Sequence, residues 1–324
     1  MSVAVYETIG QRAWELIAKA DRVLVVTHIA PDGDAIGSLL ALGQILRQLG
    51  KTDVTLSCDD GVPDKLAFLP GATAVVTSVS DSFDLVIVVD CSDEGRGGRV
   101  FRAAVGGRPL VINIDHHITN TGFGDVNIVQ PDTAATTEIL FLLAAAWGVT
   151  LDKDTAQCLL TGLVTDTLCF RTANATAGVM SIATDLMQAG ADLSYITSRT
   201  VNRRSYDAIC YWGTLLQSID LDDGVVSVCA SANDHPVNGD ASVVSLLITA
   251  KEADMAVSFV ETENGQVEVS LRAKPGFDVA QIAYKLRGGG HSAAAGCTVD
   301  GSLDEVVDQV LAMMKKARRG QSRA

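Results

Sequence analysis

The sequence has few aromatic residues and few prolines, and it lacks any long apolar run. Phe, Trp and Tyr make up 5% of its 324 residues, and seven prolines stand against 29 glycines, which excludes a proline-rich spacer. No apolar stretch reaches the roughly 18 residues of a membrane span, and residues 1–22 are too mixed for a signal peptide. We therefore expect a cytoplasmic protein with no membrane partner.

Basic residues are also scarce. Lys and Arg total 25 against 39 Asp and Glu, which gives a net charge of −14. A chain so acidic lacks the basic footprint of broad binding to duplex DNA, so we expect none. An anionic substrate remains compatible with this charge if bound cations and a few arginines reverse the field at one site.

Paired cysteines are missing too. The seven cysteines are an odd number, are scattered and never form a CxxC spacing. This pattern argues against a disulfide framework and against a zinc site made of thiolates. We expect reduced, buried thiols.

What the sequence does contain is an alternation of strand and helix patterns. Continuous apolar runs at 22–27, 53–57, 84–89 and 110–114 predict strands that are covered on both faces, as in parallel sheets. Helical spacing follows at 35–49, 134–147, 153–165 and 176–189. These patterns predict an α/β fold whose first domain is a parallel sheet.

The pattern changes after residue 192. Residues 193–218 have helical spacing and predict a helical connector, whose apolar positions leave a homodimer open. Short strands at 225–230, 255–260 and 267–273 then predict a second, smaller α+β domain. The expected organisation is therefore a domain over 1–192, a connector over 193–218 and a domain over 219–324.

Histidine and aspartate side chains stand where the apolar strands end. The residues concerned are His28, Asp32 and Asp34 after the first strand, Asp90 after the third, Asp115, His116 and His117 after the fourth, and Asp166 after an apolar helix. Taken singly, each has a structural explanation, such as a helix cap, an Asx turn or a core histidine. Ligands of open α/β sheets bind beyond the carboxyl ends of the strands, so we expect these side chains to meet.

Such a cluster of carboxylates would repel itself unless cations are bound. Carboxylates suit Mg²⁺ and Mn²⁺, and the imidazoles shift the preference towards Mn²⁺. Six ligands, His28, Asp32, Asp34, Asp90, His116 and Asp166, are too many for one ion with an open position. They suit two divalent cations that share a carboxylate and activate a hydroxide for attack on phosphorus.

These spaced motifs resemble a known family. His28-x-x-x-Asp32-Gly33-Asp34, Asp90, Asp115-His116-His117 and Gly162-x-x-x-Asp166 look like the DHH phosphoesterase superfamily. Gly288-Gly289-Gly290-His291, followed by Ala294-Ala295-Gly296, resembles the signature of the DHHA1 domain. The combination covers residues 10–315 and is most similar to the bacterial bifunctional oligoribonuclease (nanoRNase) and pAp phosphatase branch.

The resemblance implies a role for each matching residue. One ion would be held by His28, Asp32 and Asp90, and the other by Asp34, Asp90, His116 and Asp166, with Asp90 as the bridge. His117 would lie beside the scissile phosphate, where it stabilises charge or protonates the leaving oxygen, and Asp115 would orient the histidines. Arg272 and the glycine-rich loop, Gly288 to His291, would bind the substrate.

The glycine-rich loop also has a physical interpretation of its own. Consecutive glycines let backbone N–H groups approach a phosphate, and His291 adds a directional donor, although a flexible turn is the structural alternative. Arg287 stands where relatives often carry a fourth glycine, and Ser292 where a basic residue is common. Arg171, shortly after Asp166, is a candidate for phosphate binding or for a structural ion pair.

The favoured function is a Mn²⁺-dependent phosphoesterase. It would hydrolyse very short oligoribonucleotides to mononucleotides, and 3′-phosphoadenosine 5′-phosphate (pAp) to AMP. The alternatives within the superfamily are a phosphodiesterase for the linear dinucleotides released from cyclic ones, and an inorganic pyrophosphatase or exopolyphosphatase. A non-catalytic nucleotide-binding protein is disfavoured because every expected ligand position is filled.

Overall fold

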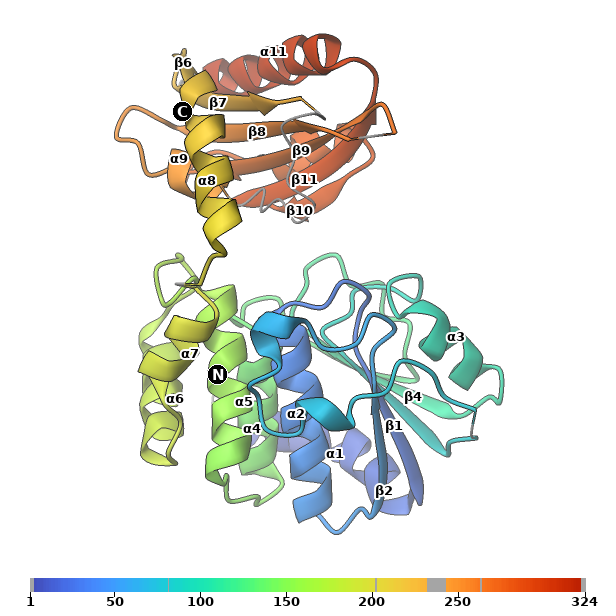
Figure 1. Ribbon diagram of the computed structural model, residues 1–324. Helices are drawn as coiled ribbons and strands as arrows, with labels where there is room; N and C mark the ends of the chain where they lie inside the picture. The colour runs from blue at the N-terminus through green and yellow to red at the C-terminus, as the bar shows by residue number, and fades with distance from the viewer. Residues whose placement is uncertain (1–2, 81, 202, 232–242, 263, 322–324) are drawn as a thin grey trace. The chain divides into compact units, whose positions relative to one another are not determined.

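The computed structural model describes residues 3–80, 82–201, 203–231, 243–262 and 264–321. The chain forms two compact units that divide between Arg203 and Arg204. Each unit contains one β-sheet with helices packed on it (Figure 1). The expected connector over 193–218 contributes to both units, because α7 (Leu193–Arg199) packs in the first and α8 (Tyr206–Leu215) in the second.

The first unit is built on a parallel sheet, as the apolar runs predict. Its strands are β1 (Arg22–Val26), β2 (Asp53–Ser57), β3 (Leu85–Val89), β4 (Leu110–Asp115) and β5 (Val126–Val129). They lie in the order β2-β1-β3-β4-β5, and every neighbouring pair is parallel. The chain reverses its direction of travel across the sheet between β1 and β3, so the ends of these two strands form a topological switch point.

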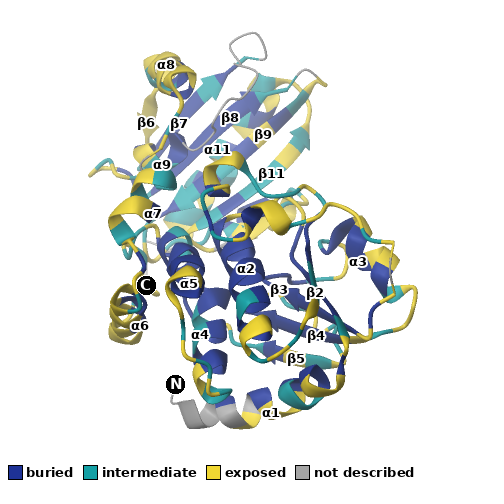
Figure 2. Ribbon diagram, turned by 60° about the horizontal axis from the view of Figure 1, so that its bottom comes forward, coloured by how far each residue is buried: buried dark blue, intermediate teal, exposed yellow. Residues whose placement is uncertain are grey.

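Both faces of this sheet are covered. Val23 and Val25 of β1 pack in one core with residues of α1 (Val3–Lys19), α2 (Gly33–Gln48), α4 (Thr136–Ala146), α5 (Lys153–Asp166), α6 (Ala177–Gln188) and α7. Leu24 and Val26 point the other way and pack with α3 (Gly98–Val105). Strands β3 and β4 accordingly run as buried ribbons (Figure 2). Burial of both faces leaves the strand ends as the part of the sheet that can meet a ligand.

Two glycines allow α2 and α5 to pack closely. A Cβ on Gly37 would lie 2.7 Å from the carbonyl oxygen of Cys158, and one on Gly162 would overlap Asp34 Oδ1 and Thr137 Oγ1. Because a side chain at either position would force the helices apart, these glycines set the separation between Asp34 on α2 and Asp166 at the end of α5. Gly162 of the sequence motif thus acts through packing.

The second unit is a mixed α+β structure, as expected. Its strands are β6 (Asp220–Asp222), β7 (Val225–Ala230), β8 (Met255–Glu261), β9 (Gln266–Ala273), β10 (Gly289–His291) and β11 (Ala294–Asp300). They lie in the order β10-β11-β9-β8-β7-β6; β7 and β8 are parallel and the other pairs antiparallel. One face packs against α10 (Ala280–Lys285) and α11 (Leu303–Gln321), and the other against α8 and α9 (Val244–Leu247).

The glycine-rich segment was expected to be a loop, and that expectation is wrong for Gly289–His291, which form the edge strand β10. A Cβ on Gly288 would overlap the carbonyl oxygen of Gly296, and one on Gly290, whose φ is +135°, would lie 2.6 Å from Ala295 Cα. These two glycines let the strand lie against β11. A Cβ on Gly289 would meet nothing within 4 Å, so the fold does not require glycine there.

The cysteines are free thiols, but they are not uniformly buried. Cys58, Cys91 and Cys158 are buried, three others are partly exposed, and Cys210 is exposed. The expectation of buried thiols is therefore wrong for Cys210, because the buried residues of α8, such as Tyr211 and Leu215, lie on its other side. Among the described residues, no helix combines the length and apolar character needed to cross a bilayer.

The close packing of α2 on α5 makes a stability prediction. Gly37→Ala should lower the free energy of unfolding by about 1–3 kcal/mol, because the new methyl group meets the backbone of Cys158. Urea denaturation followed by circular dichroism measures the change. Gly178→Ala on α6 is the matched control, since its Cβ meets only Thr176 Oγ1 at an ordinary 3.5 Å. Equal stabilities of the two variants would contradict the packing assignment.

Candidate active site

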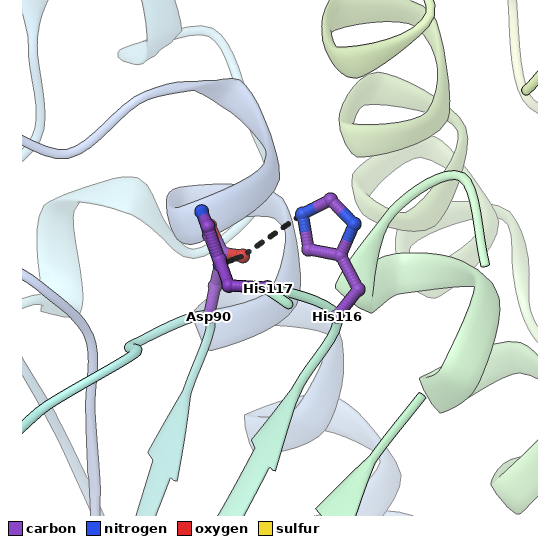
Figure 3. A group of neighbouring side chains, drawn as sticks. All are labelled: Asp90, His116 and His117. Carbon is purple, nitrogen blue, oxygen red and sulfur yellow. Dashed lines mark ion pairs between the residues drawn. The ribbon is translucent and has the colours of Figure 1, made fainter. Parts of the chain in front are cut away.

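The expected site residues meet at the carboxyl ends of adjacent strands. His28 lies two residues beyond β1, Asp90 directly follows β3, and Asp115 ends β4 immediately before His116 and His117. Figure 3 shows Asp90 and the two histidines side by side at the ends of neighbouring strands. The topological switch point therefore carries this group of side chains.

Asp90 is the centre of the cluster. Its Oδ2 lies 3.6 Å from His28 Nε2, and its Oδ1 lies 3.7 Å from His116 Nε2. Thr136 Oγ1 donates a hydrogen bond of 2.9 Å to the same Oδ1. Asp90 is 1% exposed and has a φ of +56°, a left-handed conformation that aspartate tolerates better than most residues. The turn directs each carboxylate oxygen of Asp90 towards a different imidazole.

The charge state of Asp90 follows from these neighbours. Burial alone would raise the pKa of this carboxyl, but the hydrogen bond with His28 and the charges of His116 and His117 outweigh it and hold the pKa below its ordinary value. His116 responds in the opposite sense. Burial would lower its pKa, yet the hydrogen bond with Asp166 and the charges of Asp90 and Asp34 raise it to about 10. The neighbouring carboxylates thus favour the protonated, positively charged form of His116.

Asp34 is held by the N-terminus of α4. Its Oδ2 accepts a 2.6 Å hydrogen bond from the backbone N–H of Thr136, and its Oδ1 accepts bonds from the N–H (3.0 Å) and hydroxyl (2.7 Å) of Thr137. These donors fix a fully buried carboxylate. Burial and the nearby charges of Asp90 and Asp166 nevertheless raise its pKa well above the ordinary value. The helix terminus orients Asp34 without removing the repulsion from its neighbours.

Asp166 and Asp32 are two further carboxylates of this group, and the charge of Asp32 acts on Asp166. Asp166 ends α5 with an oxygen 3.3 Å from His116 Nε2, and burial together with the charges of Asp32 and Asp90 raises its pKa to about 6. Asp32 is exposed and caps α2, accepting from the N–H groups of Asp34 (3.1 Å) and Ala35 (3.0 Å). Its structural explanation as a helix cap is therefore correct, but only Oδ1 is used.

The segment that follows Asp166 is strained. Leu168, Cys169 and Phe170 all have positive φ values, 48°, 62° and 60°, although none is glycine. The hydroxyl of Thr167 holds this left-handed turn, since it donates to Leu163 O (2.5 Å) and accepts from Phe170 N (2.9 Å). Non-glycine residues in this conformation cost about 1–2 kcal/mol each, and the turn fixes the chain directly beyond Asp166.

The donor set fits divalent cations. Ligand atoms of His28, Asp32 and Asp90 lie within 4.8 Å of one another, as do those of Asp34, His116 and Asp166. The other ring nitrogens of His28 and His116 lie 2.7 Å from Ile29 O and 3.4 Å from Thr133 O. A proton on each Nδ1, donated to these carbonyls, leaves each Nε2 lone pair for a metal ion.

His117 is oriented differently from the other histidines. Its Nδ1 lies 2.7 Å from Asp115 Oδ1, which also accepts from the backbone N–H of His116 at 2.9 Å. Asn120 donates to the second oxygen of Asp115 at 2.6 Å. Ligand atoms of Asp90, His116 and His117 also come within 4.8 Å of one another, but the Nδ1 of His117 already contacts Asp115.

The expected substrate-binding residues lie in two places. In the second unit, Ala294 is opposite both Arg272 and His291, so the three form one cross-strand row; the side chain of His291 lies outside the described part. Burial lowers the pKa of the Arg272 guanidinium, which donates 2.9 Å to Leu271 O. In the first unit, Arg171 is exposed and donates to Leu168 O at 2.7 Å, with no carboxylate partner among the described residues.

The two departures from the family pattern have different structural settings. Arg287 has a φ of +61°, the conformation for which glycine is favoured, so a fourth glycine would suit its backbone. Ser292 lies in the turn between β10 and β11, where its carbonyl accepts from Val279 N at 3.0 Å.

Sequence reasoning missed three residues of the site. Thr136 and Thr137 bind Asp90 and Asp34, and Arg96 Nη2 lies 3.1 Å from His28 Nδ1. Paired threonines at the start of an otherwise apolar helix were a signal for the first two, because hydroxyls there have no role in the core. For Arg96 the signal was weak, a single arginine in the segment after β3.

Comparisons with known proteins match both units. Residues 22–163 match the DHH family, N-terminal domain, and residues 225–318 match the DHHA1 domain. The bifunctional oligoribonuclease and PAP phosphatase NrnA of Thermus thermophilus is 34% identical over 319 residues, which are 94% of this chain and 95% of the relative. The chain belongs to the DHH phosphoesterase family. The family and this relative indicate a metal-dependent hydrolase of phosphoester bonds.

Two further similarities extend the family assignment. The crystal structure of an exopolyphosphatase-related protein from Bacteroides fragilis has a TM-score of 0.88 at 23% identity and covers 97% of this chain and 98% of its own, which supports the fold. A probable manganese-dependent inorganic pyrophosphatase of Bacillus mycoides is 28% identical over 203 residues, which are 54% of this chain and 62% of the relative. That similarity leaves almost half of this DHH family chain unmatched.

The raised pKa of Asp166 predicts a stability that depends on pH and metal. The folded protein binds the proton on this carboxyl more tightly than the unfolded chain, with a pKa of about 6 against the usual 3.8. The stability that proton binding at Asp166 contributes is therefore present below pH 3.8 and is lost as the pH rises through about 6. In EDTA at pH 8, Asp166→Asn should have a higher Tm than the wild type, and the difference should vanish near pH 4.

Manganese should reverse this order. Mn²⁺ should raise the Tm of the wild type more than that of Asp166→Asn, because the variant has lost an expected ligand. Differential scanning fluorimetry measures both effects. Asp185→Asn, an exposed carboxylate on α6, is the control and should follow the wild type. If Asp166→Asn had a lower Tm than the wild type in EDTA at pH 8, the charged Asp166 would stabilise the metal-free protein, which would contradict the prediction.

Proposed function

We propose that this DHH phosphoesterase hydrolyses very short oligoribonucleotides to mononucleotides, and pAp to AMP, with two divalent cations of which Mn²⁺ is preferred. The observation that carries the proposal is the meeting of six ligand residues from four segments at the end of the parallel sheet. The NrnA relative, whose name describes these two activities, matches the chain over both units.

The geometry of Asp90 supports a pair of ions. One would be held by His28, Asp32 and Asp90, and the other by Asp34, Asp90, His116 and Asp166. The two oxygens of Asp90 face His28 and His116 respectively, which supports its assignment to both ions. Imidazole ligands favour Mn²⁺ over Mg²⁺, and no thiolate is among the clustered donors.

Bound cations would provide a water nucleophile at neutral pH and neutralise charge on the phosphoryl oxygens. The chain's own contribution is orientation and proton transfer. Asp115 accepts from His117 Nδ1 and thereby fixes the orientation of this ring. We assign His117 the stabilisation of charge on the scissile phosphate and protonation of the leaving oxygen, with Asp115 as the residue that orients it.

The second unit supplies groups suited to an anion. Arg272 is a partly buried guanidinium in one row with Ala294 and His291, and the open space at Gly289 leaves the adjacent backbone accessible. A buried arginine needs an anionic partner, and a phosphate group of the substrate fits it. We therefore assign Arg272, Gly288, Gly289, Gly290 and His291 to substrate binding. Arg171, without a carboxylate partner among the described residues, is assigned to phosphate in the first unit.

The surface next to the site favours a nucleotide over pyrophosphate. Three aliphatic side chains follow site residues directly or within two positions: Ile29, Leu168 and Ile118 are 40%, 46% and 79% exposed. Inorganic pyrophosphate has no apolar part, whereas a nucleoside does. A linear dinucleotide released from a cyclic one would also fit this surface and is the second candidate. The partial match to a manganese-dependent pyrophosphatase makes pyrophosphate the remaining alternative.

An activity screen tests the function. The purified full chain with Mn²⁺ should release mononucleotides from dinucleotides faster than from 20-mers, and phosphate from pAp faster than from pyrophosphate. Mg²⁺ in place of Mn²⁺ should lower the rates. Faster cleavage of 20-mers would reject the preference for short substrates, and faster phosphate release from pyrophosphate would favour the pyrophosphatase alternative.

Gly289 offers a test of the second unit. Gly289→Ala should leave the Tm unchanged, because its Cβ meets nothing within 4 Å, but should raise the KM for a dinucleotide about tenfold by keeping phosphate from the backbone. Gly213→Ala on α8 is the matched control, because its Cβ also meets nothing within 4 Å and it lies away from β10. An unchanged KM in Gly289→Ala would remove β10 from the substrate site.

A further inference from the structure

Arg96 is a cationic residue at the candidate metal centre that the proposed function leaves without a role. It lies in the segment after β3 that begins with Asp90, and its Nη2 is 3.1 Å from His28 Nδ1. Its backbone is fixed at both ends, since Arg96 N donates to Asp93 Oδ1 (3.1 Å) and Arg96 O accepts from Ile29 N (2.9 Å). The guanidinium therefore lies on the Nδ1 side of the His28 ring, and Nε2, on the other side, faces Asp90.

The two contacts of His28 Nδ1 require opposite tautomers. The carbonyl oxygen of Ile29, 2.7 Å away, can only accept, so this contact needs a proton on Nδ1. A guanidinium can only donate, so the contact with Arg96 needs a lone pair on the same nitrogen. One neutral imidazole cannot satisfy both neighbours, and the state of Nε2 decides which contact is made.

If His28 Nε2 held a cation, as the proposed function has it, the imidazole proton would reside on Nδ1 and be donated to Ile29 O. Arg96 would then lose its acceptor on the ring. The guanidinium is left beside the metal centre with an unused donor. Phosphoryl oxygens are the anionic acceptors that the proposed reaction brings there, and arginine binds them in fork geometry.

We propose that Arg96 binds a phosphoryl oxygen of the substrate, and that metal binding at His28 makes it available to do so. This proposal rests on the proposed function in taking the substrate to be a phosphate compound and His28 to hold a cation. Phosphate binding and metal binding are then coupled, each favouring the other. Phosphate should therefore bind more tightly to the cation-loaded site than to the empty one.

Binding of inorganic phosphate to the full chain tests the coupling without turnover. Isothermal titration calorimetry in Mn²⁺ and in EDTA gives the ratio of the two phosphate affinities. Arg96→Met should weaken phosphate binding to the Mn²⁺ form about tenfold or more, and should lower this ratio by the same factor. Its affinity for Mn²⁺ should stay within about threefold of the wild type, since Arg96 is not a ligand. Arg102→Met, an exposed arginine on α3, is the matched control and should change neither.

Two results would overturn the proposal. If Arg96→Met keeps the phosphate affinity of the Mn²⁺ form, Arg96 does not bind phosphate. If it weakens Mn²⁺ binding tenfold, Arg96 instead positions His28. Should Arg96→Met fail to fold, Arg96→Lys decides: it retains the charge without the fork and should bind phosphate more weakly than the wild type. Phosphate affinity equal to that of the wild type in Arg96→Lys would contradict the proposed contact.

A spectroscopic measurement follows the tautomer directly. In the wild type, the ¹⁵N resonances of His28 should report a proton on Nδ1 when a diamagnetic divalent cation such as Mg²⁺ is bound. A proton on Nε2 in that form would contradict the mechanism of release. None of these measurements uses a nucleotide. A failed dinucleotide assay would therefore reject the proposed function while leaving the role of Arg96 standing. Unchanged phosphate binding in Arg96→Met would reject the role of Arg96 while leaving the proposed function standing.

Discussion

Electrostatic repulsion among clustered carboxylates is the constraint on which the first unit depends. Asp34, Asp90 and Asp166 lie in one group, where burial and the neighbouring charges raise the pKa of Asp34 and of Asp166, while contacts with imidazoles keep the pKa of Asp90 low. The fold opposes this repulsion with the backbone N–H groups at the start of α4 and with the threonine hydroxyls there. These hydrogen bonds hold together carboxylates that would otherwise repel one another.

In this unit, the packing of the helices also determines the geometry of the site. Gly37 and Gly162 bring α2 and α5 close, and the same closeness sets the spacing of Asp34 and Asp166. Asp32 has a structural role, since its Oδ1 caps α2. If its other oxygen holds a cation, as we propose, the same cap orients that ligand.

The sequence predicts the parallel sheet and the clustered side chains well, because continuous apolar runs and the residues that end them are local signals. It predicts the glycine-rich segment poorly. Consecutive glycines favour a loop by their own propensity, whereas Gly289–His291 are a strand through pairing with β11, which lies several residues later. Thr136 and Thr137 were missed for a related reason. The paired threonines at the start of α4 were a local signal, but their partners, Asp90 and Asp34, are distant in the chain, so the sequence did not show what the hydroxyls bind.

The left-handed turn at Leu168, Cys169 and Phe170 has a consequence for how this enzyme can change over generations. Glycine at any of these positions would relieve backbone strain and make folding easier, but it would also give the chain beyond Asp166 more freedom. A substitution there that raises the free energy of unfolding would then lower the rate of hydrolysis. Selection for stability and selection for activity would therefore favour different residues in this short segment.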